Sequence, residues 1–202
     1  MGMDYSFLLY FNRQNLWEAL QGVASISQPS PLPTLIVFPD HMLSIPLKGW
    51  GQDEKLLRHD AAEFGFMTSI YFPADAAIRN YLQRVSPEHF AAMSRESLLG
   101  LPVGYIYLTI YNNMVNFREK TWDPDLVLFD FSTPGTSMSL LFAESDSIRN
   151  RFIRLLEKYH GICGVLNLED TGRVFWLNGR RMEREIPDAY MPPAEIEEFL
   201  RL

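Results

Sequence analysis

The sequence predicts an α+β fold in which mainly antiparallel sheets carry helices on one face and are built from repeated strand-helix-strand-strand units. Three observations support this fold class. Hydrophobic residues make up 47% of the 202 residues, which is enough for a substantial core. Three apolar segments each lead into a helical pattern, and each of these pairs is followed by two short strand-like runs. We expect a single compact domain over residues 1–202, with possible lobes at 1–120 and 121–202.

Three segments share the pattern of a strand that leads into a helix. The predicted strands span residues 6–11, 68–72 and 138–142. After Phe72 the triplet Ile-Arg-Asn follows at residues 78–80, and it follows at the same distance after Phe142. The match indicates an internal duplication in which Phe11, Phe72 and Phe142 end equivalent strands. The alternative is a chance likeness of strand and helix composition.

Each strand-helix pair is followed by residues that predict a β-hairpin. The paired runs are 34–38 with 42–46, 103–111 with 115–119, and 163–168 with 173–177. Asn112 and Asn113 separate the second pair and tolerate the positive φ of a tight turn. The recurring unit is therefore strand, helix, strand, strand.

Further elements are predicted around these units. They are a helix that begins at Ser86-Pro87-Glu88 and reaches Leu98, a strand at 125–132 that turns back as a hairpin at Pro134-Gly135, and a C-terminal helix that opens at Pro192-Pro193. A Ser/Pro-rich connector covers residues 27–33, and a polar loop covers residues 48–54.

The charge balance and the cysteine content exclude several classes of partner. Because 18 Lys+Arg stand against 25 Asp+Glu, the formal net charge is −7, and we expect no nucleic-acid partner. Two arginine groups, at 149–154 and 180–184, are interleaved with or followed by carboxylates, so we assign both to solvated faces. The single cysteine rules out an intramolecular disulfide and favours a cytoplasmic location. The apolar runs are far shorter than the ~20 residues of a membrane span, so no membrane association is expected.

The residues offer no familiar cofactor or catalytic motif. Neither the glycine-rich dinucleotide motif nor the P-loop motif is present, and the four histidines are scattered, so we predict no cofactor and no metal site. An enzyme without a recognisable motif is an alternative. It would need His160, Cys163, Asp40 and His41, or some of them, to meet in the fold.

A row of tyrosines marks the strand predicted at 103–111. Strand alternation places Tyr105, Tyr107, Thr109 and Tyr111 on one face, and an isoleucine-leucine-isoleucine row on the other, which should meet the core. Tyrosine rings offer apolar area with a polar tip, so Tyr105, Tyr107 and Tyr111 are the candidate ligand-binding residues. The alternative is that these rings form a second core layer.

The order of the predicted elements is similar to that of ligand-binding domains related to gyrase inhibitors. The similarity covers element order alone and implies no functional residue. The tyrosine row, together with the lack of any catalytic constellation, favours a non-catalytic binding module for a small amphipathic ligand or a protein partner. A structural protein that forms a homo-oligomer through its strand edges is a further alternative.

Overall fold

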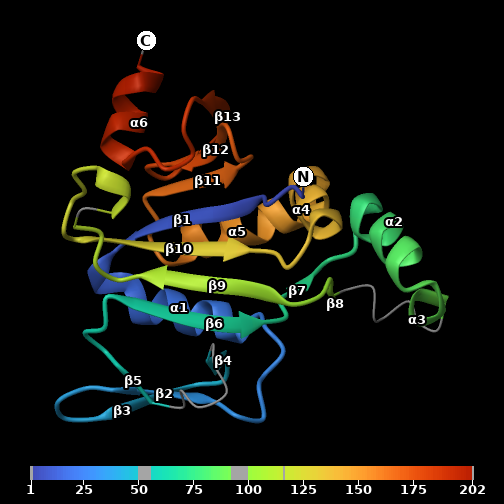
Figure 1. Cartoon of the computed structure of the whole chain (residues 1–202), viewed down its shortest axis with the longest axis horizontal. Helices are drawn as coiled ribbons and strands as arrows, with labels where there is room; N and C mark the ends of the chain where they lie inside the picture. The colour runs from blue at the N-terminus through green and yellow to red at the C-terminus, as the bar shows by residue number, and fades with distance from the viewer. Residues whose placement is uncertain (1, 50–55, 92–99, 116, 202) are drawn as a thin grey trace.

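The computed structural model describes residues 2–49, 56–91, 100–115 and 117–201, and it confirms an α+β fold built on a large antiparallel sheet (Figure 1). The eight strands lie in the order β13-β12-β11-β1-β10-β9-β6-β4. Their bounds are β1 Ser6–Asn12, β4 Lys48–Gly49, β6 Glu63–Thr68, β9 Ile106–Tyr111, β10 Leu126–Ser132, β11 Cys163–Asn167, β12 Gly172–Leu177 and β13 Arg180–Ile186. Because β1 pairs with both β10 and β11, the two ends of the chain share one sheet.

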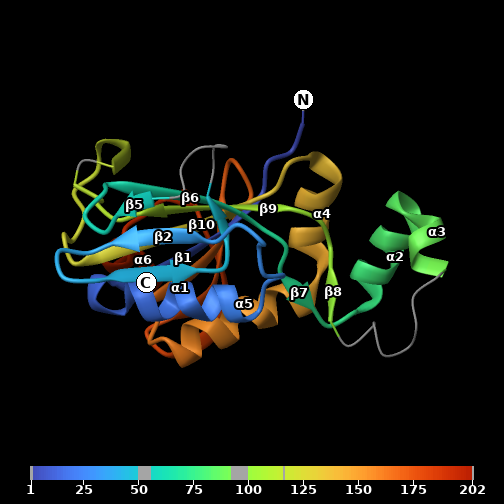
Figure 2. The same cartoon turned by 90° about the horizontal axis from the view of Figure 1, so that it is seen from below.

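One face of the sheet is covered by helices α1 (Leu16–Ser25), α4 (Thr136–Glu144) and α5 (Asp146–Lys158), and α1 and α5 run beneath the strands in Figure 2. Phenylalanines fill the space between these layers. The ring centroid of Phe152 lies 4.7 Å from that of Phe7 and 4.7 Å from that of Phe131. Helices α1 and α5 approach closely at Gly22, where an added Cβ would lie 2.1 Å from the ring of Tyr159. These contacts form the main core.

The opposite face of the sheet is partly covered by helix α6 (Pro193–Leu200) and by the segment that follows β9. Alternate residues of β1 face the two sides, which is why this strand is buried along almost its whole length. Leu8 and Tyr10 belong to a second, smaller core that includes Ile196 of α6. The sheet therefore has a fully covered face and a half-covered one.

The remaining elements lie around this sheet. They are the 3-10 turns η1 (Arg13–Asn15) and η3 (Phe117–Glu119), helices α2 (Ala76–Val85) and α3 (Pro87–Ala91), a small sheet of β2 (Thr34–Val37), β3 (Met42–Ile45) and β5 (Leu56–Arg58), and the pair β7 (Tyr71–Phe72) and β8 (Leu101–Pro102). The hairpins predicted at 34–46 and 163–177 are confirmed. The helix expected to run from residue 86 to 98 is present as α3, and its second half, residues 92–99, lies outside the described residues, as does most of the polar loop.

The strand predicted at 138–142 is wrong, because these residues belong to helix α4. Met138, Leu141 and Phe142 are buried together, a spacing of three and four residues that fits a helix against the sheet. The predicted hairpin turn at Pro134-Gly135 instead leads into this helix. The internal repeat is accordingly not confirmed, since the three phenylalanines that were expected to be equivalent lie in β1, in β7 outside the large sheet, and in α4.

A second predicted strand, at 115–119, is also wrong. Residues Phe117–Glu119 form the 3-10 turn η3, in which Arg118 has φ 51° and Glu119 has φ 59°. Both residues lie in the left-handed region, which interrupts strand pairing. This segment instead folds back over the half-covered face beside α6.

The outermost strand, β13, is rich in charge. Arg180, Arg181, Glu183, Arg184 and Glu185 are all exposed. Glu183 lies within 4 Å of Arg149 of α5 and of Arg173 of β12. The edge of the sheet at this end is therefore a row of mixed charges.

Candidate functional site

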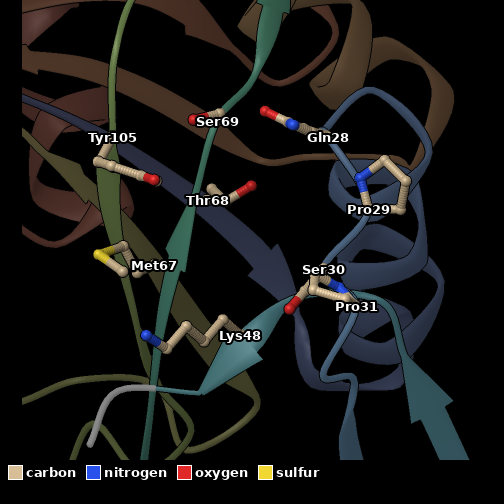
Figure 3. A pocket seen from close by; sticks show the side chains of 9 residues that line it. All are labelled: Gln28, Pro29, Ser30, Pro31, Lys48, Met67, Thr68, Ser69 and Tyr105. Atoms are coloured by element: carbon tan, nitrogen blue, oxygen red, sulfur yellow. The ribbon is translucent and has the colours of Figure 1, made fainter. Parts of the chain in front are cut away.

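A pocket of about 190 Å³ opens between the end of β6 and the Ser/Pro-rich connector that follows α1 (Figure 3). Two backbone hydrogen bonds fasten the connector to residues that lie close to β6 and β4 in the chain. The backbone N–H of Gln28 donates to the carbonyl of Ser69 at 2.8 Å, and the N–H of Ser30 donates to the carbonyl of Pro46 at 2.9 Å. The wall of the pocket is thus held in place by backbone hydrogen bonds.

Thr68, the last residue of β6, supplies the least satisfied group of the pocket. Its side chain is only 3% exposed, and its hydroxyl oxygen has no hydrogen-bond partner. In Figure 3 this hydroxyl points toward the connector that carries Pro29. An unpartnered buried hydroxyl costs about 1–3 kcal/mol, so a ligand that pairs with it would recover that energy.

A second buried threonine, Thr34 at the start of β2, shows how a buried hydroxyl is usually satisfied. Its side chain is 1% exposed, and its hydroxyl donates to the carbonyl of Leu47 at 3.0 Å. Thr34 and Thr68 are equally buried, yet only the threonine in the pocket lacks a partner. Burial alone therefore does not leave a threonine hydroxyl without a partner, and the unpaired hydroxyl of Thr68 distinguishes the pocket lining.

Lys48 of β4 is the one charged residue among the described residues that line the pocket. No hydrogen bond or ion pair holds its ammonium group within the part of the chain that the structure describes. It extends across β6 toward Met67 in Figure 3. The pocket is therefore lined by a cation without a partner among the described residues and by a buried hydroxyl without a partner.

Apolar surfaces complete the pocket. The rings of Pro29 and Pro31 form the connector wall, and Met67 and Tyr105 lie on the other side of β6. Tyr105 is 60% exposed and precedes β9. A pocket with apolar walls and a few polar groups at one place is the usual form of a small-molecule site.

The structure does not gather the three candidate tyrosines into one groove. Tyr105 lines the pocket, and Tyr107 is half-buried near the start of β9, opposite Met67 on one neighbouring strand and Ser132 on the other. Tyr111 lies at the far end of β9, where its ring packs on Phe117 at 4.6 Å. The alternation along the strand is as predicted, with the aliphatic row buried in the main core.

The far end of β9 carries a buried polar cluster. The hydroxyl of Tyr190 donates to Oδ2 of Asp130 at 3.2 Å, while Oδ1 of Asp130 and the hydroxyl of Tyr10 have no partner. Burial raises the pKa of Asp130 to about 6, although hydrogen bonds from Ser6 and Tyr190 lower it. The same cluster contains Trp122, whose ring stacks on Tyr10 at 5.8 Å.

Cations on the covering segment close this cluster. The guanidinium of Arg118 lies 3.6 Å from the ring centroid of Tyr190. Lys120 forms an ion pair with Asp188 and also donates to the carbonyl of Tyr190 at 3.0 Å. The polar groups at this end are therefore enclosed, whereas Tyr105 at the other end of the strand is 60% exposed.

The residues of the enzyme alternative are not joined. Cys163 is fully buried in β11, and burial raises the pKa of its thiol, which disfavours the reactive thiolate. Asp40 and His41 pair with each other at 2.8 Å at an exposed turn. Across the described ranges, no hydrogen bond or ion pair links that turn to His160 or Cys163, and no three His, Cys, Asp or Glu side chains are placed to hold a metal.

Comparison of the chain with protein-family models, with curated proteins and with solved structures found no match. Within the described segments, no helix combines the length and the hydrophobicity that crossing a bilayer requires.

Sequence reasoning identified one residue of the pocket, Tyr105, and missed the polar ones. Lys48 and Thr68 lie 20 positions apart and line one pocket because β4 pairs with β6, where Lys48 is opposite Met67, the neighbour of Thr68. The Ser/Pro-rich composition of the connector was visible in the sequence. No local pattern indicates that this connector faces the end of a strand 40 residues downstream.

Proposed function

We propose that the protein is a non-catalytic binding module that holds a small amphipathic ligand with a carboxylate or similar anionic group in the pocket beside Tyr105. Two observations support this proposal: the buried hydroxyl of Thr68 has no partner, and on the other side of β6 the ammonium group of Lys48 makes no hydrogen bond or ion pair with the described residues. An anionic oxygen accepts hydrogen bonds from both kinds of group.

The walls of the pocket favour a ligand with an apolar part. Pro29, Pro31 and Met67 offer aliphatic surface, and Tyr105 offers the face of a ring. The volume of about 190 Å³ suits a small molecule, since a cavity of about 150 Å³ holds benzene. A small ligand is therefore favoured over a protein partner at this site. The free, buried thiol of Cys163 accords with a reducing compartment, and we propose a cytoplasmic location.

Benzoate is a suitable probe because it joins a carboxylate to one ring. We expect benzoate to bind the unmodified protein, measured by shifts of amide resonances in nuclear magnetic resonance titrations. Thr68→Val and Lys48→Met should each weaken this binding about tenfold, the loss expected for one charge-assisted hydrogen bond. Benzyl alcohol, which has the ring without the charge, should bind more weakly than benzoate.

Thr34→Val is the matched control. It removes a buried threonine hydroxyl outside the pocket lining, so benzoate binding should stay unchanged. If Thr68→Val and Thr34→Val affect binding equally, or if neither benzoate nor benzyl alcohol shifts resonances of residues 28–31, 48 and 67–69, the proposed site is wrong.

A further inference from the structure

A second cleft, of about 470 Å³, lies along helix α5. Ser147, Asn150, Arg151 and Arg154 follow one another at spacings of three, one and three residues, which places them on one face of the helix. Arg181 of β13 faces them across the cleft. Although the chain carries a net charge of −7, three arginines meet here.

The guanidinium groups of Arg151 and Arg154 are the second feature of this cleft. No hydrogen bond or ion pair holds either guanidinium among the residues that the structure describes, and Nε of Arg151 is buried without a partner. Burial lowers the pKa of Arg151, and the positive charge of Arg154 lowers it further. Two neighbouring cations that repel each other in a half-buried cleft form a site that an anion would stabilise.

The carboxylates in the cleft already have partners other than Arg151 and Arg154. Asp75 caps helix α2 by accepting from the N–H of Ile78 at 2.9 Å, and it accepts from Ser145 and Ser147 at 2.7 and 3.0 Å. Asp146 lies 3.6 Å from Arg149. These carboxylates therefore compete little for Arg151 and Arg154.

Helix α5 also holds Arg181 in the lining of the cleft. Its Nε and Nη2 donate to Glu157 at 3.2 and 3.0 Å, which leaves Nη1 for a ligand. Arginine forks match the oxygens of a phosphate group, and several forks together bind it more firmly than a single lysine would.

We infer that this cleft binds a phosphate monoester, whose oxygens are held by Arg151 and Arg154 of α5 and by Arg181 of β13. The phosphate group neutralises the charges of Arg151 and Arg154. Because this cleft shares no lining residue with the pocket beside Tyr105, the inference stands apart from the proposed ligand there.

The test uses glycerol 3-phosphate and a phosphoserine peptide as two sources of the same group, titrated by calorimetry at constant ionic strength. Binding of either supports the site, and the tighter one identifies the source. Arg151→Gln and Arg154→Gln should each weaken binding about tenfold, and added salt should weaken it in the unmodified protein.

Arg184→Gln is the matched control, because it removes the same charge from β13 on the face opposite to Arg181. Binding to this variant should stay within about twofold of the unmodified protein. If Arg184→Gln weakens binding as much as Arg154→Gln, or if neither ligand binds at millimolar concentration, the inference is overturned. Arg151→Lys, which keeps the charge and loses the fork, should also weaken binding and serves if the glutamine variant fails to fold.

Discussion

Tyr105 and Tyr111 lie at the two ends of β9 on the same face of the sheet, but their surroundings differ. At one end Tyr111 packs on Phe117 in an enclosed cluster with Trp122 and Tyr190, and at the other end Tyr105 is 60% exposed beside a pocket. The strand is the same, so the difference comes from what lies over it. The segment after β9 and helix α6 cover one end, and the connector at the other end leaves an opening. Strand alternation assigns residues to a face, and the covering segments decide whether that face becomes core or site.

The largest expected effect tests the enclosed end. Trp122 is 5% exposed, stacks near Tyr10, and donates its indole N–H to the carbonyl of Phe117 at 2.8 Å. Trp122→Ala should lower the free energy of unfolding by about 3–5 kcal/mol, because it leaves a large cavity. Tyr105→Ala should change it by less than about 0.5 kcal/mol. Chemical denaturation of both variants measures this contrast, and equal effects would show that the two ends do not differ.

The next effect is a pH dependence at the enclosed end. The folded protein holds the proton of Asp130 up to about pH 6, whereas the unfolded chain releases it near pH 4. Stability contributed by this group is therefore present at low pH and is lost as pH rises from about 4 to 6, by about 2–3 kcal/mol. Asp130→Asn cannot titrate and should be more stable than the unmodified protein at pH 7, with a smaller advantage at pH 4. Denaturation curves at both pH values measure it, and an advantage that grows as the pH falls would contradict this account.

The smallest effect compares the two buried threonines. Thr68→Val removes an unpartnered hydroxyl and should raise the free energy of unfolding by about 1 kcal/mol, while Thr34→Val loses a hydrogen bond and should lower it by about 1 kcal/mol. Thermal denaturation of the pair measures the opposite signs. If both variants lose stability, the hydroxyl of Thr68 is satisfied in solution, and the pocket loses its main support.

The parts of the fold that the sequence predicts well are those with a clear period. The alternation of β9 and the two hairpins at 34–46 and 163–177 were predicted correctly. The run 138–142 was assigned to a strand because a short apolar run fits either element. The position of this run between Gly135 and Ser145 makes it a helix. Gly135 immediately precedes α4, and Ser145 caps the N-terminus of the next helix, α5.

The candidate site was less predictable for a physical reason. The alternation of a strand identifies the sheet face on which a tyrosine lies. It does not reveal whether a buried hydroxyl has a hydrogen-bond partner, because that depends on every atom around the hydroxyl. Thr34 and Thr68 look alike in the sequence, and only the folded structure pairs one of them. The arginine face of α5 was visible, yet the sequence could not show that its carboxylate neighbours bond elsewhere.

The charged outermost strand has a consequence for self-association. To add a strand from a second copy beside β13, the pairing would have to bring Arg180, Arg181, Glu183, Arg184 and Glu185 of two molecules together and strip water from them. Growth of the sheet across this edge therefore carries the cost of removing water from these charges. Light scattering at two concentrations, repeated on a variant in which these five residues are replaced by threonine, would reveal whether the charges keep the molecules apart.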